Sequence, residues 1–135
     1  MVNVKELNHV FDYKKAITTT LDDVLHKFTQ DYDGSIKTIG PHSQLLIITQ
    51  NAYIQGKINH FTHEEDENNK YFFSEGLTEL GTRLENLPET MSALNLTAPL
   101  HLKDVTISPI INPDQKRELD EMILFTDQIL GLSII

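Results

Sequence analysis

The feature that most constrains the fold is a series of short, apolar, β-rich runs. The clearest covers residues 53–61, where Ile54, Gly56 and Ile58 alternate with polar residues, as in a strand with one buried face. A similar run at 44–49 precedes it across a tight turn, and together the two runs predict a hairpin. A glycine inside a strand indicates a sharp bend or the close approach of another backbone.

Three more strands are predicted toward the C-terminus. Residues 100–107 alternate in the same way, a polar turn follows at 112–116, and residues 122–134 form two short strands broken near Asp127. Five short, bent strands cannot make two good sheets. A small closed or nearly closed barrel is favoured because it removes exposed sheet edges.

Helical periodicity precedes and interrupts these strands. Apolar spacing predicts a helix over about 20–30, capped by Thr20 and preceded by a looser helical piece. Leucines at helical spacing predict a second helix over 76–87, ended by Pro88. The sequence therefore predicts an α+β, mainly β, single domain over 1–135, made of an N-terminal helical segment (1–33), a hairpin (42–61), an insertion (62–98) and closing strands (99–135).

The strand segments resemble the Sm-like family. Ile54-Gln55-Gly56-Lys57-Ile58-Asn59-His60-Phe61 is similar to its second strand, Leu100-His101-Leu102-Lys103-Asp104-Val105 to its third, and Phe125-Thr126-Asp127-Gln128-Ile129-Leu130-Gly131-Leu132 to its closing strand pair. The matched segments lie within 44–61 and 99–134. The resemblance implies an N-terminal helix followed by a five-stranded, strongly bent, SH3-like barrel. It also implies a ring-forming oligomer that binds RNA at its pore.

The residues that bind RNA in that family do not match. The family has an Asp-x-x-x-Asn-type stretch between strands two and three, where this chain has the 62–98 insertion. It has Arg-Gly in the closing strand pair, where this chain has Thr126 and Asp127. Asp127 would repel phosphate in every subunit of a ring. No binding residue therefore carries over.

Charge disfavours nucleic acid as a partner. The chain has 11 basic and 20 acidic residues, a formal charge of −9, and it shows no cluster of Lys and Arg. Eight acids and two bases give residues 62–91 a net charge of 2 − 8 = −6, so the predicted barrel is only mildly acidic and bulk charge alone leaves RNA open. The absence of cysteine argues against a disulfide scaffold, and no apolar run could span a membrane. We expect a cytoplasmic protein.

Residues 60–67 contain the best metal-binding candidates. His60 and His63 stand beside four consecutive acids, and imidazole and carboxylate are good zinc ligands. The two histidines share a face only if this stretch is helical, and consecutive acids diverge. A solvated loop is the favoured interpretation, so we assign neither metal nor cofactor.

The catalytic inventory is thin. The chain has no cysteine nucleophile, no Gly-x-Ser-x-Gly elbow, no phosphate-binding glycine loop and no His-Glu-x-x-His motif. His101 and Asp104 are three apart on a predicted strand, so their side chains should not meet. We therefore expect no enzyme activity.

Four residues are candidates for an interaction surface. Tyr71, Phe72 and Phe73 form either an exposed anchor for a protein partner or, as we favour, ordinary packing of the insertion; Asp127 would face a shared pore. The apolar C-terminus, 130–135, should pair as a strand within the subunit or with a neighbour, which favours a homo-oligomer. The sequence predicts a non-catalytic assembly or interaction module; the alternatives are a divergent Sm-like RNA-binding protein and a small metal-binding protein or enzyme.

Overall fold

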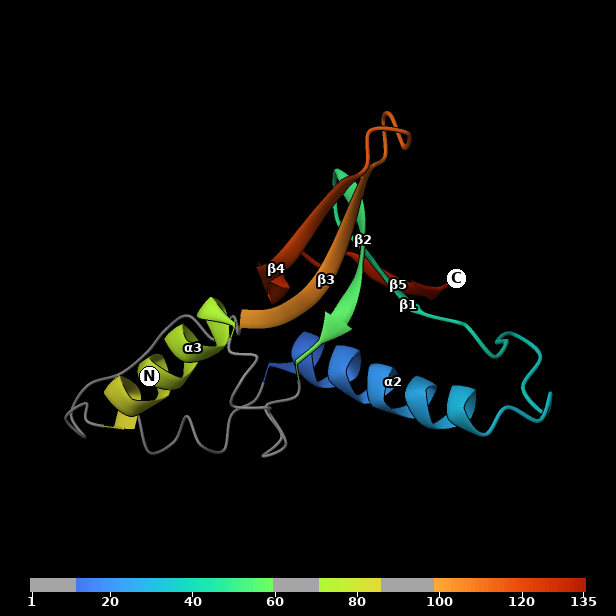
Figure 1. Ribbon diagram of the computed structural model, residues 1–135, viewed down its shortest axis with the longest axis horizontal. Coiled ribbons are helices and arrows are strands. Elements are labelled where there is room, and N and C mark those ends of the chain that lie inside the picture. The colour runs from blue at the N-terminus through green and yellow to red at the C-terminus, as the bar shows by residue number, and fades with distance from the viewer. Residues whose placement is uncertain (1–11, 60–70, 86–98) are drawn as a thin grey trace.

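The computed structural model, drawn in Figure 1, describes residues 12–59, 71–85 and 99–135. Two α-helices and five strands make up these ranges. In chain order they are α2 (Tyr13–Gln30), β1 (Leu45–Ile48), β2 (Ala52–Ile58), α3 (Phe72–Glu85), β3 (Pro99–Pro109), β4 (Arg117–Phe125), the 3-10 turn η1 (Thr126–Gln128) and β5 (Gly131–Ile134). Within these ranges, neither helix combines the length and the apolar character needed to cross a membrane.

The five strands form one antiparallel sheet in the order β4-β3-β2-β1-β5. This confirms the predicted α+β class, the 44–61 hairpin and the two closing strands, with the helical insertion between β2 and β3. The sheet is not closed, because β4 and β5 form its two edges. A closed barrel is therefore not confirmed.

The core lies where α2 crosses the sheet. Ten apolar side chains are buried there, nine of them from the sheet and the turn before β5, and Leu25 from α2. Figure 1 shows α2 running below the sheet, while α3 extends to the other side from the lower ends of β3 and β4. The two helices thus attach to different parts of the sheet.

The first helix begins earlier than predicted. Asp12 caps α2, with its carboxylate accepting a hydrogen bond from the Lys15 amide at 3.1 Å, so the predicted cap at Thr20 is wrong. The threonines remain helical because their hydroxyls donate to the preceding turn, Thr18 to the Lys14 carbonyl at 2.7 Å and Thr19 to that of Lys15. The predicted looser piece is one continuous helix from residue 13.

The predicted bend at Gly56 is confirmed. The register of β2 against β3 shifts between Gln55 and Lys57, and a Cβ at Gly56 would lie 3.2 Å from the Lys103 carbonyl oxygen. On β3 the facing residue, Asp104, has a positive φ of 51°, which aspartate tolerates better than most residues. This is a β-bulge, and it increases the local twist of the sheet.

The second helix also begins earlier than predicted. The helix predicted over 76–87 occupies Phe72–Glu85, so Phe72 and Phe73 of the aromatic run belong to its first turn and Tyr71 directly precedes it. Further along, residues 110–116 connect β3 to β4 and contain the predicted polar turn. The strand predicted over 100–107 is longer than expected, Pro99–Pro109.

Candidate functional site

The two edges of the sheet are the first candidate surface. β4 is hydrogen-bonded to β3 on one side, and β5 to β1 on one side, so each presents its other side as an edge. Leu119 and Phe125 of β4 are exposed, as are Leu130 and Ile134 at β5. Exposed apolar edges are templates for pairing with another strand. Within the part of the chain that the structure describes, each edge therefore combines a side without a strand partner with exposed apolar side chains.

The C-terminal strand pairs within the subunit, one of the two predicted outcomes. Gln44 and Ile135 exchange both backbone hydrogen bonds, at 2.9 and 3.0 Å. Because hydrogen-bonded and non-hydrogen-bonded pairs alternate in an antiparallel ladder, the Leu45–Ile134 pair is of the second kind. The Ile134 amide therefore points away from β1, toward the open edge.

The turn between β4 and β5 is tied to the start of α2. Thr126 is buried, and its hydroxyl donates to the carboxylate of Asp12, whose other oxygen caps the helix. The Lys14 ammonium donates to the Ile129 carbonyl at 2.7 Å. Asp127 is exposed. Where the Sm-like family has arginine, this chain thus has Thr126, whose buried hydroxyl is hydrogen-bonded to Asp12.

Partial burial also shifts the pKa of Lys15, in the first turn of α2. Desolvation lowers the pKa of Lys15, and the nearby Asp12 carboxylate opposes that shift. The opposing effects follow from the position of Lys15 in the first turn of α2, half-withdrawn from water but close to the helix cap.

The predicted aromatic candidates divide into two groups. Tyr71 and Phe73 form T-shaped pairs with His101, with ring centroids 6.2 and 6.3 Å from that of the imidazole, and Lys103 lies over the Tyr71 ring. Phe72 is 76% exposed. Two of the three rings thus pack the insertion onto the sheet, and one faces solvent.

A buried polar cluster at the same place was missed in the sequence. His101 is only 1% exposed, and its Nε2 lies 2.8 Å from Glu121 on β4. Its Nδ1 lies 3.1 Å from the amide of Asn59 and 3.3 Å from the hydroxyl of Ser74. With the Glu121 carboxylate accepting from Nε2–H, Nδ1 is left to accept from the other two groups. Asn59, Ser74, His101 and Glu121 are called the His101 cluster below.

The His101 cluster fixes the start of α3. The Phe73 amide donates to both carboxylate oxygens of Glu121 at 3.2 Å, so Glu121 acts as an acceptor at a helix N-terminus. The predicted separation of His101 from Asp104 also holds, because Asp104 is exposed and its carboxylate lies 3.3 Å from Lys57. No local sequence signal identifies the true partner, because Glu121 comes next to His101 only through the register of β3 against β4, in which the two residues are diagonal.

Ser74, His101 and Glu121 are the residue types of a catalytic triad, with a serine nucleophile, a histidine base and an acidic residue. A catalytic serine must reach a substrate, however, and Ser74 is 4% exposed and accepts a hydrogen bond from Asn59 at 3.0 Å. Neither cavity described below is lined by a member of the cluster. The arrangement is suited to joining α3, β2, β3 and β4.

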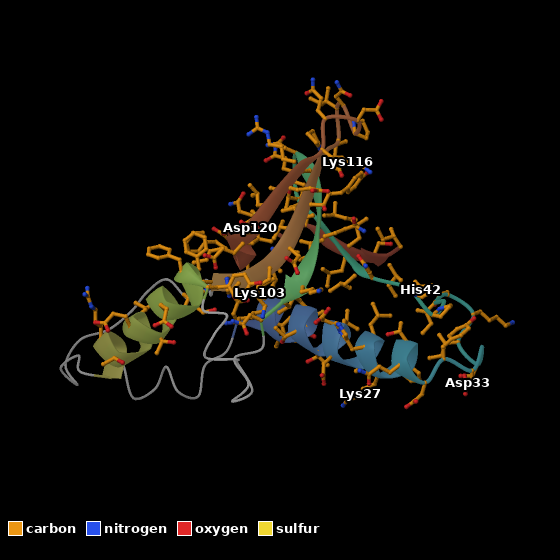
Figure 2. The ribbon with its side chains drawn as sticks, viewed as in Figure 1. Lys27, Asp33, His42, Lys103, Lys116 and Asp120 are labelled. Carbon is orange, nitrogen blue, oxygen red and sulfur yellow. The ribbon has the colours of Figure 1, made fainter. Side chains whose placement is uncertain are left out.

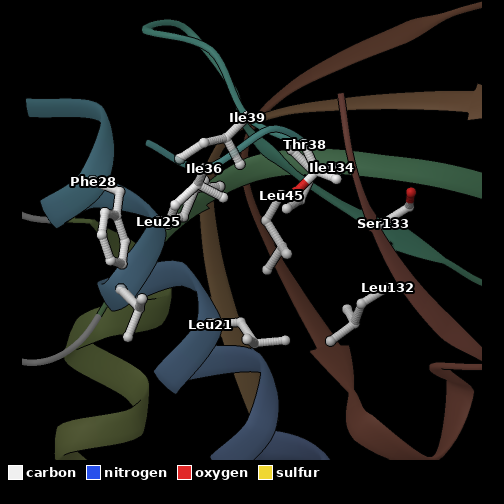
Figure 3. Close-up of a pocket in the computed structure, with 11 residues that line it drawn as sticks. Leu21, Leu25, Phe28, Ile36, Thr38, Ile39, Leu45, Leu132, Ser133 and Ile134 are labelled. Carbon is white, nitrogen blue, oxygen red and sulfur yellow. The ribbon is translucent and has the colours of Figure 1, made fainter. Parts of the chain in front are cut away.

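An apolar groove lies between α2 and β5. Its volume is about 430 Å³, and Figure 3 shows the side chains that line it, which come from α2, the loop after it, the start of β1 and β5. Val24 and Phe28 come from α2, Ile36 and Ile39 from the following loop, and Ile134 from β5. This α2–β5 groove is next to the free edge of β5, so both could contact the same partner.

A smaller, more polar pocket lies on another side of α2. It measures about 170 Å³ and includes Asp22, His26 and Lys57. Among the residues described, no group of three or more His, Cys, Asp or Glu side chains could hold a metal ion. The predicted candidates His60 and His63 lie outside the described residues.

No family model matches the sequence, and searches of curated proteins and of solved structures also gave no match. The free edges, the adjoining groove and the His101 cluster therefore have to be interpreted from their own geometry.

Proposed function

We propose that the chain is a non-catalytic assembly module that self-associates by pairing the β4 edge of one copy with the β5 edge of the next, as an open barrel of Sm-like type. The observation that carries the proposal is that one sheet ends in two different edges, both bearing exposed apolar side chains. Each edge offers unpaired backbone groups to a neighbour. Cytoplasmic location belongs to the same proposal.

The proposed contact is head-to-tail. Because β4 and β5 are different surfaces, every copy keeps one free edge after its first contact, and growth ends only if the rotation between copies closes a ring. Leu119 and Phe125 on one edge, and Leu130 and Ile134 on the other, would be withdrawn from water in each contact.

Local features favour assembly over RNA binding. The buried Thr126 hydroxyl is bonded to Asp12, Asp127 is exposed, and the insertion carries most of the net negative charge. None of these provides the cationic contacts on which phosphate binding depends. A test with a random RNA pool at low salt addresses the alternative, and sub-micromolar, salt-sensitive binding would overturn our preference.

The direct test is a proline at the outward-facing amide of β5. In Ile134→Pro, the ring removes that N–H and obstructs the edge, while the hydrogen bonds between Gln44 and Ile135 remain. We expect light scattering to show a multiple of the 15.4 kDa chain mass for the wild type and the monomer mass for the variant. Ile134→Ala, which keeps the amide, is the matched control. A wild type that is monomeric at about 100 µM, far above typical specific affinities, contradicts the proposal.

A further inference from the structure

The tip of the β3–β4 hairpin carries an apolar projection. Ile111 is 98% exposed, and the adjacent Ile110 is also exposed, in a connection whose remaining residues, 112–116, are polar. A single exposed isoleucine is ordinary, but here two adjacent ones stand at the end of a hairpin. The same chain has an apolar groove of about 430 Å³, open among the residues that the structure describes.

The tip does not reach the groove of its own subunit. The Ile110 amide donates to the Asn51 carbonyl at 3.0 Å, which holds the base of the tip against the turn between β1 and β2. The groove is lined by Leu45, at the opposite end of β1. In Figure 2, Lys116 marks the tip at the top of the molecule, while Lys27 and Asp33 mark the end of α2 near the groove.

We propose that the Ile110–Ile111 tip of one copy inserts into the α2–β5 groove of the next copy. The inference rests on the proposed function and names the part of the contact that selects the correct partner. If β4 of one copy pairs antiparallel with β5 of its neighbour, the start of β4 lies beside the end of β5. The hairpin tip, which directly precedes β4, then projects past Ile134 toward the groove.

The charges of the two surfaces also favour the hairpin tip as the occupant of the groove. Residues 110–117 carry two bases and one acid, a net charge of 2 − 1 = +1. Residues 21–33, which form the helical wall of the groove and the turn after it, carry one base and four acids, a net charge of 1 − 4 = −3. The two surfaces attract each other, and the attraction gives direction to a contact whose affinity comes from the isoleucines.

The first experiment substitutes the projection. Because Ile111 is almost fully exposed, Ile111→Asp should fold normally, as circular dichroism can verify, yet it places a charge in an apolar groove. We expect the dissociation constant for self-association, measured by sedimentation, to rise at least about tenfold. Ile111→Leu, which keeps the apolar volume, should leave the constant within about threefold.

A mixing experiment tests whether tip and groove meet. Val24→Asp damages the groove and leaves the tip intact, whereas Ile111→Asp does the reverse. At a concentration where each variant alone is monomeric, an equimolar mixture should form a dimer, because the intact tip of one fits the intact groove of the other. A mixture that stays monomeric overturns the proposal.

The outcomes separate this inference from the assembly proposal. A monomeric wild type overturns the proposed function and the inference with it. A wild type that self-associates with the same constant as Ile111→Asp overturns only the inference. Since the chain has no cysteine, an equimolar mixture of Ile111→Cys and Thr38→Cys gives an independent check: oxidation should link the two variants to each other faster than either variant to itself if tip and groove meet between copies.

Discussion

The two helices are both held to the sheet by polar contacts at their first turns, but they differ in how much of their remaining length is buried. α3 is fixed at its first turn by the buried polar His101 cluster, and beyond Leu77 the side chains of α3 that the structure describes are exposed. α2 is fixed at its first turn by Asp12 and Lys14, then packs Leu25 into the core and leaves an apolar groove beside it. Both attachments are made at helix starts, where unpaired amides need acceptors. The difference is that α3 adds only the ring contact of Phe73 with His101 to its polar groups, whereas α2 adds the burial of Leu25 in the core.

The largest effect should come from breaking the attachment of α3. His101→Ala removes a buried ring and leaves Glu121 and Asn59 without it, so we expect a loss of roughly 3 kcal/mol in the free energy of unfolding. Urea denaturation measures it. Glu118→Gln, an exposed change on β4, the strand of Glu121, should cost less than about 0.5 kcal/mol. An equal effect of both changes would show that the His101 cluster does not hold α3.

A smaller effect should come from the corresponding contact of α2. Thr126→Val removes the hydroxyl that donates to Asp12 at nearly constant volume, and a hydrogen bond to a charged group contributes about 1.5–3 kcal/mol. Thr126→Ser should recover most of that loss. A double-mutant cycle with Asp12→Ala would give the coupling energy directly, and additive losses would contradict the contact.

The smallest effect should come from Lys14. Its ammonium donates to the Ile129 carbonyl from an exposed position, so Lys14→Met should lower stability by about 0.5–1 kcal/mol. Lys27→Met, at the other end of α2, is the control, because its exposed ion pair with Asp23 should contribute less. Thermal melts of the two variants would rank their losses of stability. A larger loss for Lys27→Met would contradict the attachment of α2 at its first turn.

The strands could be predicted because their information is local. Ile54, Gly56 and Ile58 show both the period of two and the bend, and the bulge opposite Gly56 follows from its missing Cβ. The start of α2 was mispredicted for a physical reason. Thr20 is a good capping residue, but Asp12 is capable of the same role and also receives a hydrogen bond from Thr126, more than 100 residues away.

The candidate surfaces were less predictable because they join distant segments. The pairing of His101 with Glu121 depends on the register of β3 against β4, and the groove combines α2, the loop after it and the last strand. The apolar C-terminus indicated self-association from sequence alone. The hairpin tip could not be identified in this way, because the sequence does not show that Ile111 is exposed. Local periodicity identifies elements, whereas their surfaces appear after they are placed together.

The hydrogen bond from the Asn59 amide to the His101 carbonyl, 3.0 Å long, joins the strands at the point where the insertion leaves and re-enters the sheet. The two ends of the insertion are therefore held next to each other, whatever the length of chain between them. Because the entropy of closing a loop grows only slowly with its length, this segment can be shortened or lengthened at small cost to the sheet, provided that the contacts of Phe73 and Ser74 with the His101 cluster are kept. The position is thus a natural place to graft a different recognition element onto an unchanged framework.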